Sequence, residues 1–524
     1  MRNGMHKGTW GKGGAAGICR RAAHGAAGAA LAGLFLLLAV FFAVGMGMDV
    51  RLRAPEVVRY ARGSLAGTLI GTVLMLAAVL ALSAWMQRLR IRTMACVMAL
   101  WTGLTILFLE AAGTRQMVDF AYVCDAASRF AQGDYQPLLG DYFHACSYQL
   151  GTCLLFEIVL RLLPGVDIGL FMQGANAVLS AASAGMLAAM CGVLTRDRRA
   201  GRSLLALVLL GLPIPLYCIH AYGTLPMIFL CSGAFLCVAL YVSKGRLRFG
   251  VGCALLSAAA YMVKPNAAIV LLALLICAAL HALLTKDCRL LLCAAGGILL
   301  AVMLANAAVW QYELRSGIRL REDVSMLARL TMGMQDGPRG AGWYNGYIEQ
   351  FFPASVSAQQ EHDIALADLT ARLEQMGNNP MQTLKFFAQK ALSQWIEPTY
   401  GTLLYGNACE QAGPFAQAAQ AVFSEESALR MALEASMKAW QQALYLLSAV
   451  GVWRIWRDGR RSAASLILPV TVLGGFLYHM LFEAKSQYIY TYAVYLLPLA
   501  AQGLCTLKAE IFDFFKKRRR FARI

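Results

Sequence analysis

The chain has 524 residues, of which 59% are hydrophobic and only 15% are charged. This balance lies far outside that of soluble globular proteins, so a soluble or secreted enzyme is excluded and a lipid bilayer is the expected solvent. The 47 Lys and Arg residues outnumber the 29 Asp and Glu residues. In so apolar a chain, this excess indicates cytoplasmic flanks of membrane helices rather than nucleic-acid binding.

The apolar stretches are numerous and long. A helix needs about 20 mostly apolar residues to cross the hydrocarbon core of a bilayer. The sequence therefore predicts an all-α polytopic membrane protein with about twelve transmembrane helices. The predicted spans cover residues 25–48, 64–86, 93–112, 166–194, 203–218, 226–243, 249–263, 265–284, 289–310, 437–454, 462–480 and 488–505.

Basic residues predict the orientation, because short loops rich in Lys and Arg stay in the cytoplasm. With a cytoplasmic N-terminus, most basic loops and the basic C-terminal tail fall on the cytoplasmic side. These clusters lie near residues 88–92, 196–202, 244–248, 286–289, 457–461 and 516–520. The loop between the first two spans disagrees, because it places Arg51, Arg53, Arg59 and Arg62 outside. Lipid headgroups are the only partners that the sequence suggests for these four arginines.

The apolar stretch 148–163 is expected to lie on the outer surface and not to cross. It has only about 16 residues and contains Glu157 and Arg161, each of which would cost roughly 2.5–3.5 kcal/mol at the bilayer centre. The chain then divides into a cytoplasmic head with three spans, a first external loop with surface helices, a six-span core, a large external cap, three last spans and a basic tail. The respective ranges are 1–112, 113–165, 166–310, 311–436, 437–505 and 506–524. Amphipathic stretches at 355–376 and 380–395 predict that the cap is helical.

Cofactor signals are weak. The fifteen cysteines lie singly, without C-x-x-C pairs or metal-ligand spacing, and are interpreted as small buried hydrophobes. Cys124 and Cys146 share one external loop, so a disulfide between them is an open but less favoured alternative. No nucleotide-binding loop is present, which disfavours an energy-coupled pump. No cofactor is expected with certainty, and a divalent cation stays an open alternative.

The first external loop carries the most informative residue, Asp119. Asp119 opens an apolar pattern of helical spacing, and Gly133 is placed to end that helix. Two interpretations are about equally favoured. As a helix N-cap, Asp119 would satisfy a free backbone N–H. As a carboxylate close to the end of a span, it is also placed to act as a general base at the membrane surface.

This segment resembles the first external loop of the GT-C class of integral-membrane glycosyltransferases, in particular bacterial relatives of protein O-mannosyltransferases and aminoarabinose transferases (family 39-like). Members carry an aspartate just after a span, a Gly-Asp-Tyr/Trp element about fourteen residues later, and then Tyr-Phe. Asp119, Gly133-Asp134-Tyr135 and Tyr142-Phe143 match these positions. Ser147 departs from the family, because it stands where Pro is usual.

Other short motifs agree with the resemblance, which covers about residues 113–500. Ala260-Tyr-Met-Val-Lys-Pro-Asn-Ala267 resembles a hairpin with Lys at the outer face, and Phe482-Glu-Ala-Lys-Ser-Gln-Tyr488 resembles the element that opens the last span. Gly342-Trp-Tyr-Asn-Gly346 and Gln394-Trp-Ile-Glu-Pro398 look similar to segments of some members. The second external turn, Tyr222–Pro226, lacks the acidic residue that many members have, which puts a second carboxylate or a shared metal site in doubt.

The resemblance implies an inverting transfer of a sugar from a polyprenyl-phosphate donor to a glycan, lipid or protein acceptor, on the external face of a bacterial plasma membrane. Asp119 would be the base. Lys264 and Lys485 would stabilise the anionic phosphate, although a lysine at a helix end also snorkels to headgroups without any function. Lys485 has Glu483 as a candidate ion-pair partner. Arg339, in a polar turn, is a weaker candidate for which a solvated role is favoured.

Aromatic residues are the remaining candidates. Tyr142, Trp343, Tyr344 and Trp395 are candidates for stacking on sugars, although an interfacial aromatic belt is the more common role of such residues. His144 is weighed as a metal ligand, with a structural role favoured. Two other functional classes stay open: a secondary transporter or flippase of lipid-linked or envelope precursors, and a non-catalytic membrane scaffold. The transporter is disfavoured because the ionisable groups sit at helix ends and in external loops rather than at midspan.

Overall fold

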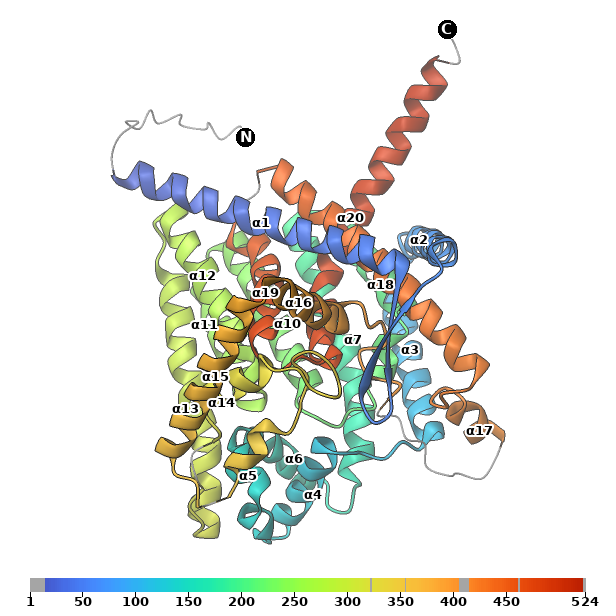
Figure 1. Ribbon diagram of the computed structural model, residues 1–524. Helices are drawn as coiled ribbons and strands as arrows, with labels where there is room; N and C mark the ends of the chain where they lie inside the picture. Colours follow the sequence, from blue (N-terminus) through green and yellow to red (C-terminus); the bar gives the residue numbers. More distant parts are fainter. Residues whose placement is uncertain (1–14, 321–322, 354, 405–413, 460–461, 522–524) are drawn as a thin grey trace.

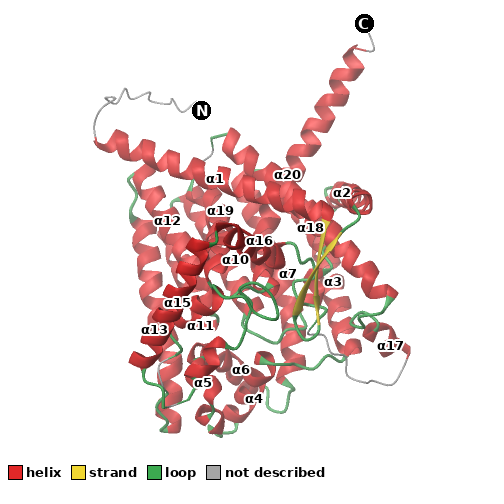
Figure 2. Ribbon diagram, in the orientation of Figure 1, coloured by secondary structure: helices red, strands yellow, loops and turns green. Residues whose placement is uncertain are grey.

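The computed structural model describes residues 15–320, 323–353, 355–404, 414–459 and 462–521. Within these ranges the chain forms twenty α-helices, four short 3-10 helices and one antiparallel strand pair (Figures 1 and 2). The prediction of an all-α polytopic membrane protein is therefore confirmed.

The long helices form a bundle. Helix α18 packs along α20 and α1, while α10 and α11 pack against α7 and α13. The helices of the bundle, together with the short helix α9 that follows α8, are α1 (Ala15–Gly47), α2 (Leu65–Met86), α3 (Ile91–Ala112), α7 (Ile168–Thr195), α8 (Arg198–Leu210), α9 (Pro213–Tyr217), α10 (Thr224–Lys244), α11 (Leu247–Val263), α12 (Ala268–Thr285), α13 (Arg289–Ser316), α18 (Ala428–Arg457), α19 (Ala463–Leu481) and α20 (Ser486–Phe521).

Shorter elements lie in the two long loops. The first group contains α4 (Asp119–Ala131), η1 (Gln136–Leu139), α5 (Asp141–Ala145), η2 (Ser147–Gln149) and α6 (Leu150–Leu162), and the second contains α14 (Met326–Gly333), η4 (Tyr347–Phe351), α15 (Ala358–Asn378), α16 (Pro380–Trp395) and α17 (Pro414–Gln420). A single turn, η3 (Pro265–Ala267), joins α11 to α12. Helices α4, α5 and α6 lie at the end of the molecule opposite to the start of α1 and the end of α20 (Figure 1).

Eight helices in the described part of the chain are long and apolar enough to cross a membrane. They coincide with eight of the twelve predicted spans. The other four predictions also fall on helices, but these do not have the length and apolarity of a simple span. The prediction 203–218 is broken between α8 and α9, and α11 has only 17 residues. Helices α18 and α20 are long, but polar and tyrosine side chains are buried within them.

Helix α6 does not have the length of a membrane span. Its 13 residues extend about 20 Å, against about 30 Å of hydrocarbon. Glu157 is buried on this helix and is neutralised by Arg161 and by Arg315 of α13, while Tyr312 donates a hydrogen bond to it at 2.7 Å. These contacts lower the cost of burying Glu157, so the expectation that the stretch 148–163 does not cross rests on its short length and stays a prediction.

The prediction of a helical cap over 311–436 was wrong for one part, the end of α16. Trp395 and residues 396–403 are buried, and the ring of Trp395 stacks on Phe41 of α1 at 5.3 Å. This irregular turn is tolerated inside the bundle because its backbone groups find partners. Glu397 accepts hydrogen bonds from the backbone N–H groups of Thr399 at 2.9 Å and Gly401 at 3.1 Å. The segment belongs to the core.

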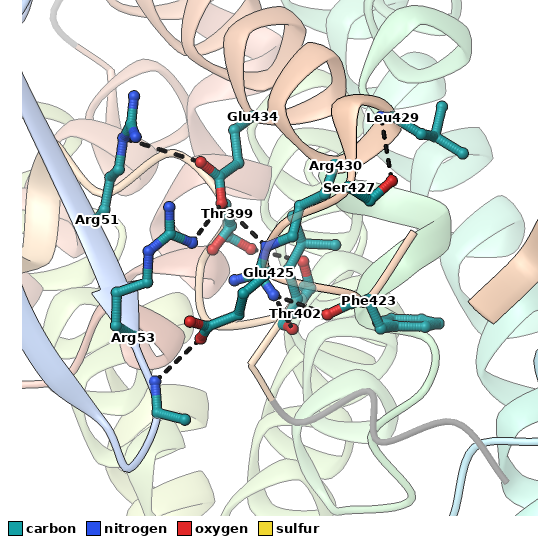
Figure 3. A network of polar contacts seen from close by, with 12 residues as sticks. Arg51, Arg53, Thr399, Thr402, Phe423, Glu425, Ser427, Leu429, Arg430 and Glu434 are labelled. Carbon is teal, nitrogen blue, oxygen red and sulfur yellow. Dashed lines mark hydrogen bonds and ion pairs between the residues drawn. The ribbon is translucent and has the colours of Figure 1, made fainter. Parts of the chain in front are cut away.

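The arginine-rich loop between α1 and α2 is a β-hairpin of β1 (Met48–Arg53) and β2 (Val57–Arg62), in which Arg53 pairs with Val57 beside the turn. Figure 2 shows the two strands beside α18. In Figure 3, Arg51 and Arg53 point toward Glu434 of α18, and their nitrogens lie 3.9 and 3.1 Å from its carboxylate. Protein carboxylates, which the sequence did not suggest as partners, therefore bind two of the four arginines.

Candidate functional site

Asp119 is the first residue of α4, six residues beyond the glycine that ends α3. The N-cap position belongs to Val118, at φ 50°, and no side chain caps the helix. The interpretation of Asp119 as the N-cap was therefore wrong. Its side chain is exposed, and its charge acts electrostatically on Lys264, Tyr142 and Glu483. Asp119 thus lies where three distant segments of the chain meet.

Helix α4 ends as its sequence predicts. Its last residue is Ala131, and Gly133 follows at φ 82°, a left-handed conformation that glycine adopts without steric cost. The carboxylate of Asp134 accepts hydrogen bonds from Arg129 at 2.7 Å and from the backbone of Gln136 at 3.0 Å. These contacts fix the turn that leads into α5, which carries Tyr142.

Tyr142 faces the same region as Asp119. Its ring stacks on Tyr122 of α4 with centroids 4.9 Å apart. Its hydroxyl is buried and has no hydrogen-bond partner among the described residues. Burial, and then the charge of Asp119, raises the pKa of Tyr142, so the phenol stays protonated. A neutral hydroxyl in this position is available to donate a hydrogen bond to a ligand.

Lys264 lies between α11 and η3 and is 8% exposed. Its ammonium sits over the ring of Tyr222, 3.8 Å from the centroid. Burial lowers the pKa of Lys264 to about 7, while the charge of Asp119 acts in the opposite direction and that of Lys485 in the same one. Among the described residues, no carboxylate forms an ion pair with Lys264.

Close packing against α6 positions the turn that carries Lys264. The hydroxyl of Thr152 donates a hydrogen bond to the carbonyl of Val263 at 2.6 Å. A Cβ on Gly151 would lie 1.7 Å from the carbonyl oxygen of Met262, so a side chain at position 151 would push α6 away from the turn. These contacts fix the position of the Lys264 turn relative to α6.

Lys485 lies in the turn between α19 and α20. The prediction of Glu483 as its ion-pair partner is not what the structure shows, because Lys485 Nζ lies 2.7 Å from the carboxylate of Glu56 at the tip of the hairpin. Arg339 also forms an ion pair with Glu56. The side chain of Arg339 is nevertheless 35% exposed, so it is both ion-paired and in part solvated. Its guanidinium lies 5.5 Å from the ring centroid of Tyr344.

Glu483 remains part of the same polar region. Tyr488 donates a hydrogen bond to its carboxylate at 3.3 Å. Burial raises the pKa of Glu483, and the charge of Lys485 opposes that rise. Glu483 is therefore a partly buried carboxyl near Lys485 with a raised pKa.

The tryptophans do not join this site. Trp343 is 1% exposed and its indole N–H donates to Ser393 at 2.9 Å, while Trp395 is fully buried. Both rings are covered by protein, so their assignment as sugar-stacking residues was wrong. Tyr344 is only partly buried and donates to Glu349 at 2.7 Å. It stays a candidate, because its ring lies beside Arg339.

Neither a cluster of metal ligands nor a disulfide between Cys124 and Cys146 is found in the described part of the chain. No group of three or more His, Cys, Asp or Glu side chains, His144 included, is placed to hold a metal ion in that part of the chain. Cys124 and Cys146 are both free. The sulfur of Cys124 contacts the carbonyl of Ala221 at 3.9 Å, whereas that of Cys146 contacts Arg329 at 3.8 Å.

The sequence reasoning missed Glu56 and Tyr222. Glu56 is 7% exposed and adopts φ 81° in the hairpin turn, where its N–H donates to the carbonyl of Arg53 at 2.8 Å. The run Met48–Arg62, with apolar residues at positions 50, 52, 57 and 58 around Ala-Pro-Glu, carried a hairpin signal. Tyr222 had no comparable signal, because its role depends on a contact with Lys264 in another loop.

Comparisons with known proteins identify a family of integral membrane proteins. No curated protein matches the chain. Among solved structures, archaeal oligosaccharyltransferase AglB from Archaeoglobus fulgidus, in complex with an inhibitory peptide and a dolichol-phosphate, aligns with a TM-score of 0.37 at 11% identity, over 81% of this chain and 52% of that chain. The chain thus spans about half the length of that protein. The model of one family, described as conserved hypothetical integral membrane protein, matches residues 31–505. The chain therefore belongs to this family of integral membrane proteins.

Proposed function

We propose that this protein is a membrane glycosyltransferase that moves a sugar from a polyprenyl-phosphate donor to an acceptor on the external face of the membrane. The observation that carries the proposal is the convergence of Asp119 with two lysines from distant segments. The charges of Asp119 and Lys485 both act on Lys264. These are the residues for which the motif resemblance implies the roles of base and phosphate ligands.

The chemistry needs each of these groups. The acceptor hydroxyl oxygen bonds to the anomeric carbon while the bond from that carbon to the phosphate oxygen breaks. The acceptor proton passes to Asp119, and the departing polyprenyl phosphate keeps the bonding electron pair. Lys264 stabilises the charge that develops on the phosphate, and its burial strengthens that interaction. A single displacement of this kind inverts the anomeric configuration.

Other side chains complete the proposed site. The buried Tyr142 hydroxyl, which has no described partner, is placed to bind the donor or the acceptor. Tyr344 offers a partly exposed ring beside Arg339 for contact with the sugar. In this proposal the N- and C-termini are cytoplasmic and the membrane is a bacterial plasma membrane. The proposed acceptor is a glycan, lipid or protein.

The test uses the purified full-length protein with a panel of radiolabelled polyprenyl-phosphate sugars and a solubilised envelope extract as the acceptor. Label is expected to move from one donor into the acceptor fraction, with free polyprenyl phosphate as the second product. Absence of both transfer and saturable donor binding across the panel would contradict the proposal. Transport of an intact donor across proteoliposomes would favour a flippase instead.

A further inference from the structure

Four cations lie around the proposed donor site: Lys264, Lys485, Arg339 and Arg329. Glu56 forms ion pairs with both Lys485 and Arg339. Arg329 donates to the carbonyls of Ala145 at 2.8 Å and Val324 at 3.2 Å and lies in the field of the partly buried Asp323. Lys264 differs from Lys485 and Arg339, which are ion-paired, and from Arg329, whose guanidinium donates to backbone carbonyls, because its described contact is the ring of Tyr222.

Glu56 is held in this position by contacts at the turn end of the hairpin. There Arg53 pairs with Glu434 at 3.1 Å, whereas Asp49 pairs with Lys438 at the opposite end of the hairpin. Near its tip, the backbone N–H of Ala54 donates to Glu425 at 3.1 Å (Figure 3). On the other strand, the N–H of Val58 donates to the carbonyl of Arg339 at 2.9 Å. The carboxylate is therefore a fixed negative charge.

We propose that Glu56 makes the site selective for a donor with one negative charge, a sugar linked through a single phosphodiester, over a donor with a sugar diphosphate. This inference rests on the proposed function, because it assumes that the donor phosphate binds at Lys264. Of the four cations, Lys264 alone has neither an ion pair nor a hydrogen bond among the described residues, and one such cation matches one charge. A second phosphate would have to take Lys485 or Arg339 from Glu56, and would lie beside its carboxylate in a region where water screens charges weakly.

The hairpin lies outside the part of the chain that carries the motif resemblance, which starts at about residue 113. The selectivity assigned to Glu56 is therefore argued from the contacts of this protein alone. A fixed negative charge repels a ligand that carries an extra negative charge, and such repulsion excludes the wrong ligand without adding affinity for the right one. Glu56 is a positioning and specificity residue in this scheme and takes no part in proton transfer.

The experiment compares two probes that carry a methyl group in place of the unidentified sugar. Methyl decaprenyl phosphate bears one negative charge, and methyl decaprenyl diphosphate bears two. Their dissociation constants are measured on the purified full-length protein and on Glu56→Gln. We expect the wild type to bind the monophosphate at least tenfold more tightly, and Glu56→Gln to reduce that ratio at least tenfold. Asp49→Asn is the matched control, because it removes a carboxylate from the same hairpin without contact to Lys485 or Arg339, and its ratio should stay at the wild-type value.

The ratio separates charge selection from a purely structural role. If Glu56 only supported the fold, Glu56→Gln would weaken the binding of both probes equally. The ratio of their dissociation constants would then stay unchanged, which would overturn the proposal. A wild type that prefers the diphosphate would overturn it as well. A wild type that binds neither probe would show that the proposed function itself fails, and this outcome is distinct from measurable binding with an unchanged ratio.

Discussion

The turn that carries Lys264 and the turn that carries Lys485 lie at corresponding places, each between two long helices, yet they treat their lysines differently. Lys485 meets a carboxylate brought by the hairpin, whereas Lys264 is more deeply buried and lies against an aromatic ring. A cation with a fixed partner contributes mainly to structure, while a desolvated cation without one favours an incoming anion. In the proposed function, donor binding therefore falls chiefly to the Lys264 turn.

The largest expected effect comes from Asp119→Asn, which removes the carboxylate whose field reaches the Lys264 turn. A carboxamide cannot accept the proton of the acceptor, so turnover should fall by about 10²- to 10⁴-fold. Thermal stability should change little, because Asp119 is exposed and does not cap α4. Transferase rates are compared with those of Asp125→Asn and Asp134→Asn. Near-normal turnover in Asp119→Asn would remove Asp119 from the mechanism.

Lys264→Met should have the next largest effect. Loss of a buried charge partner costs roughly 2–5 kcal/mol of binding, or about 30-fold or more in donor affinity. The wild type should also show a pH dependence. The ammonium binds the phosphate only when protonated, so a pKa of about 7 predicts full affinity below that value and a loss of up to tenfold per pH unit above it.

Donor affinity measured between pH 6 and 9 checks the prediction for Lys264. Lys264→Met should bind the donor weakly, and its donor affinity should not change with pH over this range, because the group that titrates is gone. Its thermal stability should equal or exceed that of the wild type, since Met fills a similar volume without a desolvated charge. A steep pH profile that persists in Lys264→Met would assign the titration to another group.

Lys485→Met should weaken donor binding less than tenfold. Its charge is already matched by Glu56, and Arg339 remains to hold that carboxylate. The double variant Lys485→Met with Glu56→Gln sharpens the comparison, because two residues that act through each other show non-additive effects. Donor affinities of the four proteins in this cycle are the measurement. An effect of Lys485→Met as large as that of Lys264→Met would remove the distinction between the two turns.

The smallest effect is expected for Trp343→Phe. The change removes one buried hydrogen bond to Ser393, which lowers the free energy of unfolding by about 0.5–1.5 kcal/mol. Ser393 keeps a partner, because its hydroxyl also donates to the carbonyl of Lys390 at 3.0 Å. Thermal denaturation and donor affinity are measured together. A loss of donor affinity without a loss of stability would show that Trp343 takes part in donor binding.

Local patterns predicted part of this arrangement. Apolar length and amphipathic spacing gave the helices, and glycine and charge patterns gave the end of α4 and the short α6. Long-range contacts could not be predicted in this way. The partners of Glu56 lie at positions 339 and 485, so no local signal connects them. The end of α16 looks amphipathic, yet it packs against α1 and α20, because burial depends on neighbours that the segment itself does not specify.

The hairpin also has a consequence for biogenesis. Its strands leave the ribosome early, but Lys485 follows Glu56 by about 430 residues, which at roughly 5–20 residues per second corresponds to about 20–90 s of synthesis. Arg339 and Glu434, the other partners of Glu56 and Arg53, are made during this interval, and Lys485 is made last. A nascent chain therefore cannot complete this charge cluster before the turn that opens its last helix has emerged, which ties assembly of the proposed site to the end of translation.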